Sequence, residues 1–175
     1  VEHIKSIRLI LLIFISVLLL FSLGCPSTAQ AHPADMYFQL HTLILMENGI
    51  QGEWQFNPGI LASPVLWGEA DLDRSSAISP DEARTWAAKR LDELDVFLDN
   101  QAPDQVEINY VDWPEGFSTL EVGKSTVTVR YQLSWSDLKP GEYEIILHNR
   151  YAEGASVNWF TLEVENNSGF EIPDQ

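Results

Sequence analysis

Hydrophobic and polar positions alternate with a period of two along much of the chain after residue 34, which is typical of β-strands. In the segment 35–47, the side chains of Tyr37, Gln39 and His41 share one face of the expected strand. The turn signal Glu47-Asn48-Gly49 then predicts a hairpin with a returning strand over 50–56. The same alternation predicts later strands over 96–99, 106–111, 126–135, 142–149 and 157–164.

Between these strands the hydrophobic period changes to that of a helix. Ser79-Pro80-Asp81-Glu82 has the pattern of a capping box with proline at the first helical position. Residues that can be buried then recur at three- and four-residue steps and predict one long amphipathic helix; they are Ala83, Trp86, Ala87, Arg90, Leu91, Leu94 and Leu98. A shorter apolar stretch over 60–67 predicts one or two further helical turns.

Together these elements predict a mainly β protein of the α+β class. Several short strands separated by turns favour an antiparallel β-sandwich over residues 32–165, with a helix-loop-helix insert at about 58–98. The polar residues 166–175 are expected to form a loose tail.

The first 31 residues have the pattern of a secretory signal peptide. Lys5 and Arg8 precede an apolar run over 9–23, and Ala29 and Ala31 have the spacing of a signal-peptidase site. The apolar run is shorter than the roughly 18 residues expected of a stable membrane span. We therefore expect export to a periplasmic or extracellular location. Two alternatives stay open: an uncleaved anchor, and a lipid anchor on Cys25.

The excess of acidic over basic residues limits the kinds of molecule that the protein can bind. The chain has 26 acidic and 10 basic residues and a formal net charge of −16. This balance argues against binding to nucleic acid and favours attraction of cations. The sequence contains no recognisable catalytic motif, which predicts a protein that is not an enzyme.

One segment of the predicted insert carries oxygen-donor residues at the spacing of an EF-hand calcium loop. Counting Asp71 as position 1, side-chain oxygens fall at positions 1, 3, 5, 9 and 12, and position 7 can supply a backbone carbonyl. Ile78, at position 8, is expected to pack behind the loop. The predicted Ca²⁺ ligands are Asp71, Asp73, Ser75, Ala77 through its carbonyl, Ser79 and Glu82.

The loop departs from the EF-hand pattern at its sixth position, where Ser76 replaces the usual glycine. This position needs a left-handed backbone, which costs a residue with a side chain roughly 1–2 kcal/mol. Because only Asp71, Asp73 and Glu82 are charged ligands, we expect weak binding. The helix cap already accounts for Ser79 and Glu82, so a vestigial loop that only keeps the turn is the alternative.

Three short motifs together resemble a known family. They are Ala31-His32-Pro33 just before a strand, the single EF-hand-like loop, and Gly141-Glu142-Tyr143 leading to His148-Asn149-Arg150-Tyr151. The combination resembles the extracytoplasmic N-terminal domain that precedes the membrane part of some nickel/cobalt permeases. The resemblance implies handling of divalent metal beside a membrane permease. Since no transmembrane segment follows Val164, the permease is expected as a separate or missing part, or the chain is a stand-alone relative.

The resemblance also draws attention to a second candidate metal site at His32. Cleavage after Ala31 gives His32 a free amine beside its imidazole, a pair that can chelate Ni²⁺, Co²⁺ or Cu²⁺. His41 lies nine residues further along an extended strand, up to about 30 Å away at ~3.3 Å per residue, so it cannot share the metal unless the chain doubles back. His148, on a distant strand, is the candidate second ligand. The alternative is a terminal histidine that is merely exposed.

Two functions of different class follow. The first is an extracytoplasmic domain that binds a divalent metal ion beside a permease. The second is a secreted interaction or adhesion sandwich in which the loop is only structural. A sugar-binding aromatic platform is disfavoured, because the tryptophans are expected in the core, with Trp113 as the candidate for exposure; the five considered are Trp54, Trp67, Trp113, Trp135 and Trp159.

Overall fold

The computed structural model describes residues 34–121, 125–139, 141–166 and 168–172. The predicted signal peptide, Cys25 and His32 lie outside these residues. The described strands are β1 (Tyr37–Met46), β2 (Gly49–Pro58), β3 (Leu94–Leu98), β4 (Gln105–Asp112), β5 (Val127–Ser134), β6 (Ile145–Asn149) and β7 (Ser156–Val164). The described helices are α2 (Ser63–Ala70), α3 (Pro80–Leu91), α4 (Phe117–Glu121) and the 3₁₀ turn η1 (Glu153–Ala155).

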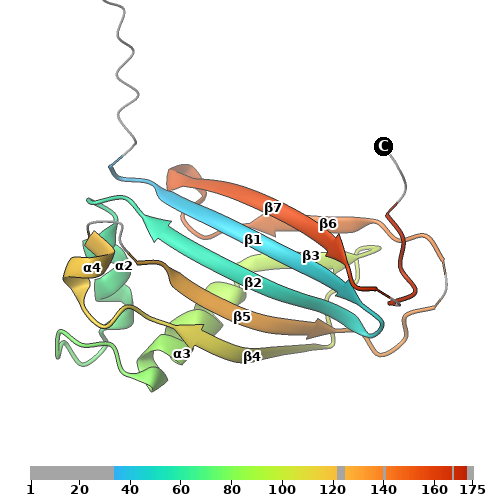
Figure 1. Cartoon of the computed structure of the whole chain (residues 1–175), viewed down its shortest axis with the longest axis horizontal. Helices are drawn as coiled ribbons and strands as arrows, with labels where there is room; N and C mark the ends of the chain where they lie inside the picture. The colour runs from blue at the N-terminus through green and yellow to red at the C-terminus, as the bar shows by residue number, and fades with distance from the viewer. Residues whose placement is uncertain (1–33, 122–124, 140, 167, 173–175) are drawn as a thin grey trace, which may run out of the picture. The chain divides into compact units, whose positions relative to one another are not determined.

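The strands form a five-stranded mixed sheet and a separate pair (Figure 1). The order in the large sheet is β4-β5-β2-β1-β7, and β3 pairs with β6 in the small one. The predicted mainly β class is confirmed, but an entirely antiparallel arrangement is wrong, because β7 runs parallel to β1. The reason is topological: β7 follows β6 of the other sheet, so no hairpin forces it to run against its neighbour.

The two longer helices lie between β2 and β3 in the chain. Ser79 caps α3, Pro80 begins it, and the reciprocal capping box with Glu82 is present, as predicted. The helix buries the expected stripe from Ala83 to Leu91. Its predicted continuation to Leu98 is wrong, because the chain turns at Asp92 and enters β3, whereas the strand that alternation predicted over 96–99 is confirmed in large part.

The physical reason for this early helix end is the pattern of burial beyond the turn. Val96 and Leu98 are both buried, two residues apart, while the residue between them is half-buried. This period of two fits a strand that packs one face, and β6 provides its hydrogen-bonding partner. A helix could not bury the same two positions together.

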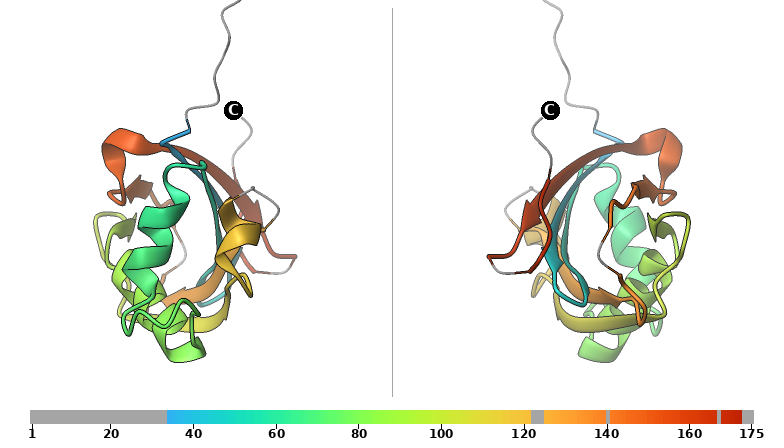
Figure 2. Two further views of the ribbon diagram at one scale, coloured as in Figure 1. Left: turned by 90° about the vertical axis from the view of Figure 1, so that its left-hand side faces the viewer. Right: turned by 90° about the vertical axis from the view of Figure 1, so that its right-hand side faces the viewer.

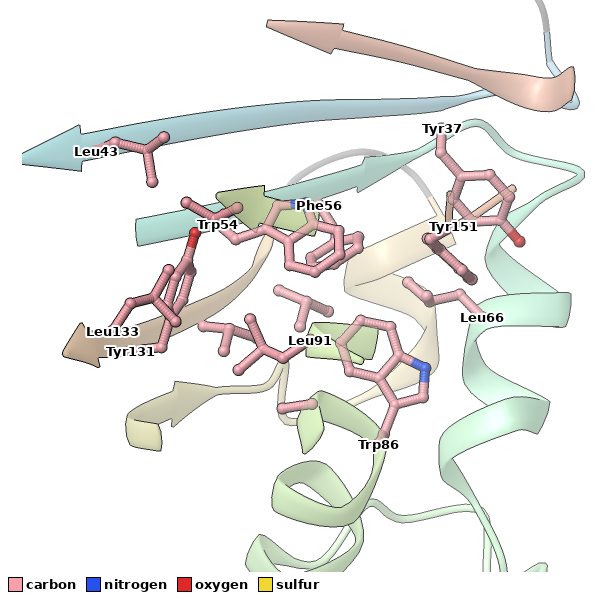
Figure 3. Packing of buried hydrophobic residues seen from close by; sticks show 14 of the residues in the cluster. Tyr37, Leu43, Trp54, Phe56, Leu66, Trp86, Leu91, Tyr131, Leu133 and Tyr151 are labelled. Carbon is pink, nitrogen blue, oxygen red and sulfur yellow. The ribbon is translucent and has the colours of Figure 1, made fainter. Parts of the chain in front are cut away.

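Aromatic side chains fill the space between the large sheet and the elements packed on one of its faces. Helices α2 and α3 and the β3–β6 pair lie on the same side of the curved sheet (Figure 2). Figure 3 shows Trp54 and Phe56 of β2 directed toward Trp86 and Leu91 of α3. The Phe56 and Trp86 rings meet edge to face, with centroids 4.9 Å apart. These contacts fix α3, the helix that follows the segment joining α2 to α3, against the large sheet.

The C-terminal segment differs from the loose tail that was expected. Ser168 is buried and Phe170 packs against the hydrophobic core. Apolar contact therefore holds part of the tail to the domain. None of the helices in the described part of the chain has the length and apolar character to cross a bilayer.

Candidate metal centre

The segment with the predicted calcium ligands joins the end of α2 to the start of α3. The amide of Asp71 donates to the carbonyl of Trp67 at 2.9 Å and so ends α2. Ser79 caps α3 at the other end. Ile78 is half-buried and packs against the core, as its position in the loop predicted. The loop is therefore anchored to the domain at both ends and through one apolar side chain.

Three carboxylates converge within this loop. One oxygen from each of Asp71, Asp73 and Glu82 lies within 4.8 Å of the other two. Across residues 34–172 with their gaps, this is the one group of three or more His, Cys, Asp or Glu side chains that come so close. Residues up to eleven positions apart are brought together because the chain reverses direction between the helices.

Backbone amides orient the first two carboxylates. Asp71 accepts hydrogen bonds from the amides of Ser75 at 2.9 Å and Ser76 at 3.0 Å, through different oxygens. Asp73 also accepts from the Ser75 amide, at 2.9 Å. The hydroxyl of Ser75 donates to the carbonyl of Ala77 at 3.0 Å. Four of the six predicted ligand residues thus belong to one hydrogen-bonded turn.

Glu82 reaches back from α3 and closes the turn. Its Oε1 accepts from the amides of Leu72 at 2.8 Å and Asp73 at 3.2 Å. Its Oε2 accepts from the Ser79 hydroxyl at 2.6 Å and from the Ser79 amide at 2.9 Å. All six predicted ligand residues are therefore connected, with Glu82 joining the two halves of the loop.

These hydrogen bonds also set the ionisation state of Glu82. The Ser79 hydroxyl, followed by the amides of Ser79, Asp73 and Leu72, lowers the pKa of the Glu82 carboxyl to about 2. Hydrogen bonds to the charged form stabilise it, so Glu82 is a carboxylate at neutral pH. A cation therefore meets a deprotonated ligand and need not displace a proton.

The backbone of the loop has two left-handed residues. Ser76 has φ 65°, as its place at the glycine position of the motif predicted. Arg74 has φ 59°, which the sequence analysis did not anticipate. Left-handed residues turn the chain sharply, and here the turn directs the Ser75 and Ser76 amides toward Asp71.

The donor set decides which ions the loop can accept. All six predicted ligand residues offer oxygen, and none offers nitrogen or sulfur. Hard oxygen donors suit Ca²⁺ and Mg²⁺, whereas Ni²⁺, Cu²⁺ and Zn²⁺ prefer sites with imidazole or thiolate. The residues present therefore fit a calcium-type ion.

The second predicted metal site is not supported at His148. His148 is 52% exposed on β6, with Nδ1 3.6 Å from Asp95 and Nε2 3.5 Å from Glu153. The two carboxylates thus lie at opposite nitrogens of the ring and do not converge on one point. Asp95 is also paired with Arg150, at 3.0 Å. His32, the proposed first ligand, lies outside the described residues.

Sequence reasoning did not anticipate a buried polar network on the inner face of the large sheet. The side-chain oxygen of Gln39 accepts from Trp54 and from Asn149, both at 2.9 Å. His41 meets the Asn158 oxygen at 3.2 Å, and Asn149 donates to that same oxygen at 2.7 Å. Gln39 and His41 lie on the same strand face as the buried Leu43 and Leu45, since every second residue of β1 points to that face. This alternation is the sequence signal that could have placed both side chains in the core.

Comparison with protein families, curated proteins and solved structures returned no match.

Proposed function

We propose that this chain is an exported extracytoplasmic domain that binds one Ca²⁺ ion through the loop 71–82. The observation that supports the proposal is the convergence of three carboxylates within 4.8 Å between two anchored helices. Like charges held so close repel one another, and a divalent cation relieves that repulsion. The ligands are Asp71, Asp73, Ser75, the Ala77 carbonyl, Ser79 and Glu82.

The composition of the site sets the expected affinity. Extracellular calcium modules bind with dissociation constants on the order of 10⁻⁴–10⁻³ M, and affinity rises with the number of charged ligands. With three carboxylates and no fourth, we place this loop in that range. Magnesium should substitute poorly, because it demands a tight octahedral shell and retains its water ligands.

In this proposal the wider fold is a β-sandwich with an EF-hand-like insert. The large sheet and the β3–β6 pair are its two layers, and α2, the loop and α3 are the helix-loop-helix insert. The resemblance to the N-terminal domains of nickel/cobalt permeases supports a role beside a divalent-metal permease outside the membrane.

A second candidate is a secreted interaction or adhesion domain in which the loop is only structural. The observation that favours it is the internal hydrogen bonding of the loop. Each of the three carboxylates accepts from at least one backbone amide of the same segment. Such bonds can hold the turn without a cation.

Thermal unfolding with calcium and with chelator separates the two candidates. At ten times its dissociation constant, calcium adds roughly 1.4 kcal/mol to the free energy of unfolding. The wild type should therefore melt at a higher temperature in calcium than in chelator, and Glu82→Gln should lose most of the difference. Glu107→Gln, at an exposed acid on β4, is the matched control and should keep it.

If the folded wild type melts identically in millimolar calcium and in chelator, the loop is structural and the second candidate stands.

A further inference from the structure

The exposure of one tryptophan contradicts the expectation that these side chains fill the core. Trp54, Trp67 and Trp135 are buried, whereas Trp159 on β7 is 51% exposed. Its ring stacks on that of Phe38, with centroids 6.0 Å apart and planes inclined by 14°. Leu40, the partner of Trp159 on β1, is also exposed, at 37%, so the two side chains belong to one apolar patch, and contiguous apolar patches mark binding surfaces more often than single exposed residues do.

Trp159 forms one wall of a hollow on the face of the large sheet opposite the core. The hollow has a volume of about 240 Å³. The six residues that line it are Phe38, Leu40, Gln55, Asn57, Thr126 and Trp159. They come from β1, β2 and β7 and from the residue that precedes β5.

The strand register shows how the two walls face each other. Leu40 of β1 pairs with Gln55 of β2 on one side and with Trp159 of β7 on the other. Neighbouring strands lie roughly 4.8 Å apart, so the backbones that carry Trp159 and Gln55 are about 10 Å apart. Leu40 lies between them as an apolar floor.

The chemistry of the two walls differs. One is aromatic, and the other consists of two amides and a hydroxyl, from Gln55, Asn57 and Thr126. The Gln55 amide donates to Glu53 at 2.6 Å, and Glu53 is paired with Arg130 at 2.7 Å, which fixes the amide in place. None of the lining residues is ionisable, although the chain has 36 charged side chains, 26 acidic and 10 basic.

We propose that this hollow binds a neutral carbohydrate. The C–H bonds on one face of a sugar ring carry a small positive charge, which suits the negative face of an indole. The hydroxyls around the ring both donate and accept hydrogen bonds, as do amide and hydroxyl side chains. The volume is below the roughly 300–1,000 Å³ of pockets that enclose drug-sized ligands, so the hollow would contact one or two rings of a longer sugar chain that continues into solvent.

The test is calorimetric and fluorescence titration of the whole protein with neutral hexasaccharides of glucose, mannose and N-acetylglucosamine. At least one should bind saturably and change the tryptophan emission. Trp159→Ala should weaken that binding at least tenfold, and Trp159→Phe should weaken it less. Val106→Ala, at an exposed apolar residue on β4, is the control and should leave it unchanged.

Asn57→Leu separates a sugar from an apolar partner, because it removes an amide and leaves the indole intact. A carbohydrate site predicts at least a fivefold loss of affinity for the same hexasaccharide. The proposal is overturned if no hexasaccharide binds the folded protein, or if Trp159→Ala binds as well as wild type. It is also overturned if Asn57→Leu binds a hexasaccharide more tightly, since the hollow would then favour apolar contact.

Discussion

His41 should make the fold lose stability as the pH falls from 8 to 5. Its ring is fully buried between Trp54 and Phe160, with centroids 4.8 and 4.4 Å away. Burial disfavours the charged imidazolium and lowers the pKa of His41 to about 4, although the hydrogen bond to Asn158 opposes the shift. Between pH 6.5 and 4 the unfolded chain therefore binds a proton at this residue that the folded chain does not.

The sign and size of the effect follow from this difference. Lowering the pH favours the state that binds more protons, which is the unfolded state, by up to about 1.4 kcal/mol per pH unit. With pKa values of 6.5 unfolded and about 4 folded, the contribution lost between pH 8 and pH 5 is about 2 kcal/mol. Most carboxylates remain ionised across this range, so they add little to the slope.

Urea unfolding at half-unit pH intervals measures this loss directly. His41→Gln removes the titrating group and should flatten the pH dependence, even if the variant is less stable throughout. His148→Gln makes the same change at a half-exposed histidine and should not remove the slope. If wild type and His41→Gln lose equal stability between pH 8 and pH 5, burial of His41 is not the cause.

Three other predictions concern packing, backbone and processing. Gly52→Ala should destabilise the fold by roughly 1–3 kcal/mol in urea unfolding, because the new alanine Cβ would lie 2.1 Å from the fully buried ring of Tyr131. An unchanged free energy of unfolding would mean that the Tyr131 ring can move aside. Ser76→Gly should stabilise the fold by up to about 1 kcal/mol in the same assay, because glycine adopts the left-handed backbone at φ 65° without strain. The gain is limited because glycine loses more conformational entropy on folding. Destabilisation would show that the strain at Ser76 is negligible. The intact mass of the exported protein should correspond to a start at His32, and a mass that includes a diacylglyceryl group on Cys25 would contradict this.

Local signals in the sequence were sufficient to predict the elements around the candidate site. The capping box at Ser79 fixed the start of α3, because its hydrogen bonds involve residues only three positions apart. The left-handed backbone at Ser76 followed from its place in the loop pattern. The approach of Asp71 and Asp73 to Glu82 follows from the same local turn.

Features that depend on distant partners were not predictable in this way. Leu94 and Leu98 continue the helical spacing of α3, whereas alternation predicts a strand over 96–99, and pairing with β6 decides between the two in favour of the strand. The parallel pairing of β7 with β1 depends on where the chain crosses between sheets. Helix α4 was missed because five residues are too few to show a helical period. Tryptophan is a residue type usually found in the core, and Trp159 is exposed because it lies on the face of β7 that points away from the core.

The central claim, that the loop 71–82 binds calcium, is tested most directly by the amide resonances of the loop during a calcium titration. The amides of Leu72, Ser75 and Ser76 donate to the carboxylates that would bind the ion, so their NMR signals must respond first. We expect saturable shifts confined to residues 71–82, with one dissociation constant on the order of 10⁻⁴–10⁻³ M, and no such shifts in Glu82→Gln. Loop amides that stay unmoved in wild type at ten millimolar calcium, while the protein remains folded, would contradict it.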